Sequence, residues 1–168
     1  STWVESDFAA GTIRRLLQSG DVRLDVEDVT PGQAARILFR AQAGWGRETY
    51  GRSLRQLLAR YTRIAKDTDN GSDERKRARQ QVRRVEAVSG WIEGLVASIP
   101  EAGADGSIDL HRIVEACLSF VERSAARASA LDAAAGSALT DAVRDLLAPR
   151  TVRCSLSVAL RFVRERVE

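Results

Sequence analysis

The sequence is poor in the residues from which several classes of functional site are built. Its 168 residues include no methionine, two cysteines and one histidine. Cys117 and Cys154 fit neither a CxxC metal motif nor a disulfide framework, and Cys117 lies on an apolar helical stripe. His111 has no second histidine with which to hold a metal ion. We therefore expect no metal site, no cofactor and a reducing, cytoplasmic setting.

Motifs for catalysis, nucleotide binding and membrane insertion are missing as well. The glycines at positions 44, 46 and 51 do not follow the GxxxxGK[ST] spacing of a phosphate-binding loop. Glu115 and Glu122 lack the partner group that would tune them as an acid–base pair. No apolar run is long enough to span a bilayer, and no signal peptide is recognisable. The sequence predicts no catalytic residue and no membrane segment.

Aromatic residues are also scarce, at 5% of the chain, so the core must consist mainly of Leu, Val, Ile and Ala. Their spacing of three to four positions predicts an all-α fold, a multi-helix bundle or irregular helical array, rather than a sheet. Residues 21–29 alternate in places, but their acidic content favours a loop over an extended segment. We expect about seven helices, over residues 7–19, 31–43, 47–66, 73–99, 108–127, 130–147 and from about 155 onward.

Two helix starts have clear local signals. Thr30 can cap free amides and Pro31 suits the first helical position. Asn70-Gly71 is typical of a turn with positive φ, after which Ser72 or Asp73 can serve as the cap. A chain of this length makes one domain, residues 1–168. We expect it to be a fragment of a larger protein, because it has no methionine and its final helix ends without a Gly or Pro cap.

Positive charge is concentrated in one part of the chain. The net charge is +3 and the isoelectric point about 9.3. Residues 47–86 contain twelve basic and six acidic residues, which gives this stretch +6 and leaves −3 for the rest. Such asymmetry suggests a face for a polyanion.

The basic residues fall into two helical rows. On the segment DERKRARQQVRR (73–84), the row lies a quarter to a half turn away from the apolar stripe, and a similar row lies opposite Leu54, Leu57 and Tyr61 on the preceding helix. If the two helices form a hairpin, the rows share one rim. The predicted nucleic-acid-binding residues are Arg52, Arg55, Arg63, Lys66, Arg75, Lys76, Arg79, Arg83 and Arg84.

Several physical features favour contact with phosphate, and one general consideration opposes it. Basic residues near a helix start oppose the helix dipole, a placement that folding alone does not favour, although Asp73 and Glu74 offset part of it. Arginine presents a planar fork suited to phosphate oxygens. No aromatic residue interrupts the run, so contact would be with the DNA backbone and non-specific. The alternative is an ordinary solvated face, which most charge runs are.

The three tryptophans supply the other candidate. Trp3, Trp45 and Trp91 are all expected to be half-buried packing residues at helix ends or interfaces. Trp45, between two glycines, is in addition a candidate partner-binding anchor. A protein–protein interaction or scaffold domain without a nucleic-acid role is therefore the alternative function. A small enzyme or ligand-binding regulator ranks third, because no convergent polar set is visible, and a deep, polar-lined cavity would favour it.

Three segments resemble a known family. ILFRAQAGWGRETYGRSLRQLLARY (37–61), CLSFVERSAARASALDAAAGSALTDAVRDLL (117–147) and SLSVALRFVRERVE (155–168) resemble a helical region of bacterial AddB/RexB-type ATP-dependent exonuclease subunits. The likeness rests on helical texture and Ala/Arg/Leu-rich composition. It implies a non-catalytic helical subdomain of a DNA double-strand-break repair enzyme that contacts DNA or a partner subunit. The family's ATPase, iron–sulfur and nuclease motifs have no counterpart in this chain, so those activities are not implied.

Overall fold

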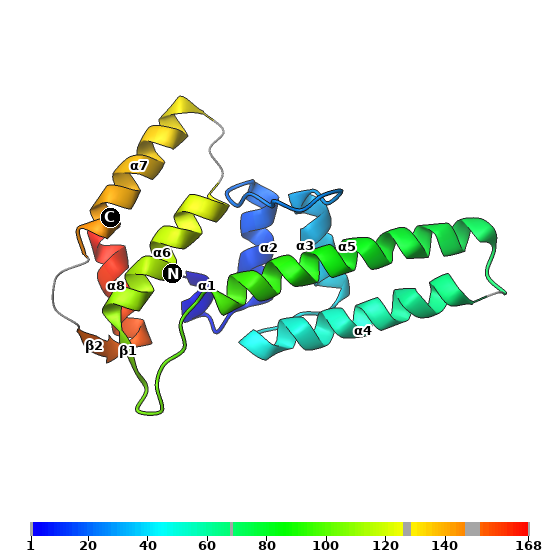
Figure 1. Cartoon of the computed structure of the whole chain (residues 1–168), viewed down its shortest axis with the longest axis horizontal. Helices are drawn as coiled ribbons and strands as arrows, with labels where there is room; N and C mark the ends of the chain where they lie inside the picture. The colour runs from blue at the N-terminus through cyan, green and yellow to red at the C-terminus, as the bar shows by residue number, and fades with distance from the viewer. Residues whose placement is uncertain (1, 68, 126–128, 147–151, 168) are drawn as a thin grey trace.

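The computed structural model describes residues 2–67, 69–125, 129–146 and 152–167. These residues form a mainly helical array, which confirms the predicted all-α class (Figure 1). The helices are α1 (Thr2–Glu5), α2 (Ala10–Ser19), α3 (Pro31–Arg40), α4 (Arg47–Lys66), α5 (Ser72–Ala97), α6 (Leu110–Ser124), α7 (Ala130–Arg144) and α8 (Leu156–Val167). Two short strands complete the fold, β1 (Ser107–Asp109) and β2 (Arg153–Ser155).

The predicted start of α3 is confirmed in detail. The Thr30 hydroxyl accepts from the Gln33 amide, and the Gln33 side chain accepts from the Thr30 amide. These reciprocal bonds satisfy amides that have no partner inside the helix, and Pro31 occupies the first position, where no amide is needed. Gly20 closes α2 in the left-handed conformation, at φ 83°.

The predicted cap of α5 is wrong. Gly71 is the residue before the helix, with φ −59°, and no side chain caps it, so neither Ser72 nor Asp73 has that role. The positive φ expected at Asn70-Gly71 is not found there. The physical reason is that the Asn70 side-chain amide donates to the Ile64 carbonyl. This bond satisfies a carbonyl in the last turn of α4, and Gly71 leads into α5 with extended backbone, at ψ 154°.

Buried side chains separate into two clusters. The first core joins α1 to α5, and the second joins α6, α7, α8 and the two strands. Val4 packs against both. The loop after α2 is tied to the end of α6, because Val22 forms an isolated bridge with Ala125.

The two strands and α1 were not predicted. β1 and β2 pair antiparallel, with Ile108 opposite Cys154. Each strand has three residues, too few to show the alternation by which a strand is recognised. α1 has four residues and is likewise shorter than any reliable periodic signal.

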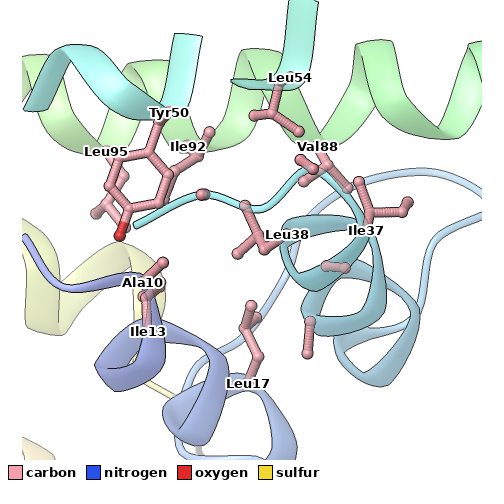
Figure 2. Close-up of a cluster of buried hydrophobic side chains, with 14 of the residues drawn as sticks. Ala10, Ile13, Leu17, Ile37, Leu38, Tyr50, Leu54, Val88, Ile92 and Leu95 are labelled. Carbon is pink, nitrogen blue, oxygen red and sulfur yellow. The ribbon is translucent and has the colours of Figure 1, made fainter. Parts of the chain in front are cut away.

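The helices α4 and α5 form an antiparallel hairpin (Figure 1), which establishes the adjacency that the two-row prediction required. At one end of the hairpin Tyr50, Leu54 and Ile92 face the side chains of α2 and α3 (Figure 2). The fully buried contribution of α4 to the first core stops at Leu57, and that of α5 begins at Val85. We call residues 58–84 the arm, and Figure 1 shows its outer end projecting beyond α2 and α3.

Candidate nucleic-acid interface

Most of the predicted basic residues are solvent-exposed. Arg63, Lys66 and the row on α5 lie within the arm, whereas Arg52 and Arg55 lie closer to the core on α4. Arg75 and Arg84 are half-buried. The exposed members are Arg52, Arg55, Arg63, Lys66, Lys76, Arg79 and Arg83.

The charge of these side chains is not neutralised by short ion pairs. In the described ranges, no carboxylate oxygen lies within 4.0 Å of a nitrogen of the nine candidate residues. The arm contains nine basic and four acidic residues. Its acids, at positions 67, 69, 73 and 74, gather at the turn between the helices. The sides of the arm are therefore more positive than its end.

Contacts between the two helices indicate how the rows are oriented. On α5, Val88 faces the core (Figure 2), while a Cβ added at Gly51 of α4 would lie 3.6 Å from Glu93 Oε1. Glu93 therefore lies on the side of α5 next to α4. Going around the helix axis from Val88 past Glu93, at about 100° per residue, the next side chains include Arg79 and Arg83, which lie opposite the core-facing side. On α4, going around the axis from the core-facing Leu57 past Gly51, which lies next to α5, leads to the basic residues of that helix. We infer that both rows lie on the side of the hairpin that faces away from α2 and α3.

The helix dipoles distinguish the two rows. Arg63 and Lys66 occupy the last turn of α4, where a positive charge is favourable. Arg75 and Lys76 lie near the positive end of α5, just after the acidic Asp73. Helix stability therefore explains why basic residues occur at positions 63 and 66, but it does not explain those at positions 75 and 76.

Arg84 differs from its neighbours in the sequence. Its Nε is buried and, within the described residues, has no hydrogen-bond partner. An enclosed guanidinium nitrogen is less accessible to a phosphate than the exposed groups at positions 79 and 83. The helical wheel did not reveal this difference, because it gives a direction and not the depth of a side chain.

The root of the hairpin is electrically mixed. Here α4 and the end of α5 line a cleft of about 480 Å³ that includes Arg52 and Arg55 together with Glu48 and Glu93. Nearby carboxylates offset part of the positive charge even without a direct ion pair. The α5 row in the arm is consequently the stronger candidate for an anion-binding surface.

Arg47, in the same cleft, has a structural role. Its guanidinium donates to the carbonyls of Ile99 and Pro100 at 2.8 and 3.1 Å. It also lies 4.7 Å from the centre of the Phe8 ring and 3.3 Å from Glu101. These contacts fix the end of α5 to the start of α4 and so position the arm.

Trp45 projects from an ordered loop, with 72% of its surface exposed. The Gly44 carbonyl accepts from the Ala10 amide at 2.7 Å, and the Gly46 amide donates to the Asp7 carbonyl at 2.6 Å. A bulky ring held on fixed backbone loses little freedom when it contacts a partner. Trp91 is half-buried as predicted. The half-buried prediction is wrong for Trp3, which is 7% exposed because it packs in the first core, and for Trp45, which the loop holds out in solvent.

Phe39 is a surface feature that the sequence analysis missed. It is 66% exposed, and the Arg14 guanidinium lies 5.2 Å from the centre of its ring. The 3.6-residue pattern of α3 was used only to identify its buried positions. Its exposure relative to the buried Leu38 could have been found from helical geometry alone.

The other ionisable candidates show no convergent site. His111 Nε2 lies 3.3 Å from Glu115 Oε1 on the surface of α6. Burial raises the pKa of the Cys117 thiol, which favours its neutral form. No cluster of three or more His, Cys, Asp or Glu side chains suited to a metal ion occurs in the part of the chain that the structure describes.

Of the helices in the described ranges, none combines the length and the apolar character needed to cross a bilayer. No protein-family model, curated protein or solved structure matches this chain. The resemblance to AddB/RexB-type subunits therefore remains a prediction from the sequence.

Proposed function

We propose that this chain is a non-catalytic helical module that binds the phosphate backbone of double-stranded DNA along its arm. The observation that carries the proposal is the exposed row of Lys76, Arg79 and Arg83 on a projecting hairpin, with no carboxylate within ion-pair distance among the described residues. Arg75, Arg63 and Lys66 extend this positive surface. Packing explains none of the exposed charges.

The chemistry of the arm favours backbone contact over base recognition. Guanidinium groups bind phosphate oxygens through paired hydrogen bonds. Tyr61 is the aromatic residue of the arm, and it is half-buried against the first core. Stacking on unpaired bases requires exposed rings. We therefore expect similar affinity for duplexes of different sequence and a strong dependence on salt.

The setting of this activity is part of the same proposal. The AddB/RexB resemblance suggests a cytoplasmic enzyme that processes double-strand breaks, in which this piece guides DNA or contacts a partner subunit. DNA binding does not depend on that parentage. A duplex-binding helical hairpin can serve any protein that must hold DNA near another site.

The test measures binding of a fluorescently labelled duplex by anisotropy, at salt concentrations from about 50 to about 200 mM. The variant carries Arg75→Ala, Arg79→Ala and Arg83→Ala. Its matched control carries Arg112→Ala, Arg123→Ala and Arg161→Ala, which removes the same charge from exposed positions of α6 and α8. We expect the arm variant to lose on the order of 100-fold or more in affinity at low salt, and the control much less. Equal losses of affinity in the two variants would mean that binding depends only on the net charge of the protein, and this would overturn the proposal.

A second candidate function rests on Trp45. Its exposed ring on a fixed loop is suited to a pocket on a partner protein, since aromatic residues of this kind dominate binding energy at many interfaces. This scaffold role would use the loop between α3 and α4, and it is compatible with DNA binding by the arm.

A further inference from the structure

A cavity of about 500 Å³ lies between the two cores. Trp3 and Ile13 line it from α1 and α2, and Ile113, Val143 and Leu160 line it from α6, α7 and α8. Each of these five side chains is at most 7% exposed. Buried residues therefore form the floor of the cavity from several sides, while half-buried residues such as Phe120 and Leu139 line its more open part.

The lining is almost entirely apolar. Its polar members are Thr12, Ser98, Cys117 and Arg164. The Ser98 hydroxyl already donates to the Leu95 carbonyl at 2.7 Å. A water molecule in such a space finds few of the hydrogen bonds it would make in bulk solvent.

The charge at the cavity narrows the class of occupant. Arg164 is the charged lining residue, and its Nη1 lies 3.4 Å from Glu5 Oε1. Because this pair is already balanced, the cavity offers no net charge to an acidic head group. An uncharged molecule has no charged group to bury without a partner, so it does not incur this cost in free energy.

We propose that this cavity is a binding site for a small, uncharged apolar molecule. Its volume is within the range of small-molecule sites, which are typically about 300–1,000 Å³ and mostly apolar. Thr12 and the Cys117 thiol supply polar atoms that can orient one polar group of the ligand. The site joins the two cores, so an occupant would contact both. It does not depend on DNA binding by the arm.

The first test uses N-phenyl-1-naphthylamine, an uncharged apolar fluorophore whose emission rises on leaving water. We expect saturable binding to the wild-type chain and a rise in its melting temperature with dye. The variant Ala116→Phe places a ring in the lining of the cavity, and Ala133→Phe places one on an exposed position of α7. Dye affinity should fall about tenfold or more in the first and stay unchanged in the second. Saturable binding that survives Ala116→Phe would overturn the assignment.

The second test does not require the filled variant to fold. In a Cys154→Ser variant, Cys117 is the remaining thiol, and it lines the cavity. We expect the dye to slow alkylation of Cys117 by N-ethylmaleimide in proportion to its occupancy. Alkylation at an unchanged rate under saturating dye would contradict the site. So would an absence of saturable binding by folded wild-type protein, which would mean that another segment of protein or only solvent fills the space.

Discussion

The two ends of the α4–α5 hairpin belong to the same helices but differ in how deeply their side chains are buried. Near the core, Tyr50 and Leu54 of α4 and Ile92 of α5 are almost fully buried against α2 and α3 (Figure 2). In the arm, Ile64 and Val82 are only half-buried. The comparison shows that packing accounts for the sequence at the base, while in the arm it accounts for the helix–helix seam and leaves the exposed charges unexplained.

The largest contrast should appear when one isoleucine is truncated in each region. Ile92→Ala removes a side chain with 0% exposure, and we expect it to lower the free energy of unfolding by about 2–5 kcal/mol. Ile64→Ala removes a half-buried one in the arm and should cost roughly 1 kcal/mol, because solvent already reaches the site. Urea denaturation of both variants measures the difference. Equal losses would show that the arm is as tightly packed as the base.

The next effect concerns the hydrogen bonds of Tyr50. Its hydroxyl donates to the Phe8 carbonyl at 2.7 Å and accepts from Trp3 Nε1 at 3.0 Å. Tyr50→Phe leaves both buried groups without this partner, and we expect a loss of about 1–3 kcal/mol. No such network lies in the described part of the arm, so Tyr61→Phe is the matched control and should change stability by less than about 0.5 kcal/mol.

Tyr50 also makes the free energy of unfolding depend on pH. Burial raises the pKa of Tyr50 to about 12. In the unfolded chain the phenol titrates near its ordinary pKa of about 10. This contribution to stability is therefore fully present below about pH 10 and is lost as the pH rises towards 12. Denaturation series from pH 9 upward should show a steeper decline in wild type than in Tyr50→Phe; parallel curves would contradict the assignment.

A smaller effect should separate Arg84 from the exposed row. Arg84→Met keeps an unbranched side chain while removing the buried Nε donor that has no partner among the described residues. We expect the free energy of unfolding to rise by about 1 kcal/mol. DNA affinity should fall less than in Arg79→Ala. A larger loss of affinity at Arg84 would mean that this side chain moves outward to reach the duplex.

The smallest change in stability is expected at Trp45. Trp45→Ala should alter the free energy of unfolding by less than about 0.5 kcal/mol, since the ring is 72% exposed. Thermal melts followed by circular dichroism measure this. A destabilisation as large as that of Ile92→Ala would show that the ring packs against the fold and is not held out for a partner.

The sequence predicted the features that depend on local periodicity. The seam of α4 and α5 and the capped start of α3 each follow from residues close together in the chain. The β1–β2 ladder joins Ile108 to Cys154, and a pairing over that separation leaves no local pattern. Gly71, without a side chain, precedes α5, and Asn70 bonds to the end of α4; local residue preferences favoured a capping side chain at Ser72 or Asp73 instead.

Of the candidate sites too, only the features that depend on local helical geometry could be predicted from the sequence. Helical geometry predicted which arm residues point away from the seam, because direction depends only on position in the helix. It did not predict that Arg84 is enclosed or that Arg52 and Arg55 share a cleft with carboxylates. It could not predict the apolar cavity, because residues from two cores, far apart in the sequence, line it.

In the proposed interface, the α5 row of the arm contacts DNA phosphates. The slope of log affinity against log salt counts those contacts, at roughly one unit per neutralised phosphate. We expect the slope of the Arg75→Ala, Arg79→Ala, Arg83→Ala variant to be shallower than that of wild type by about 2–3 units. The slope of the control at Arg112, Arg123 and Arg161 should match wild type. A wild-type slope that the arm substitutions leave unchanged would contradict the claim.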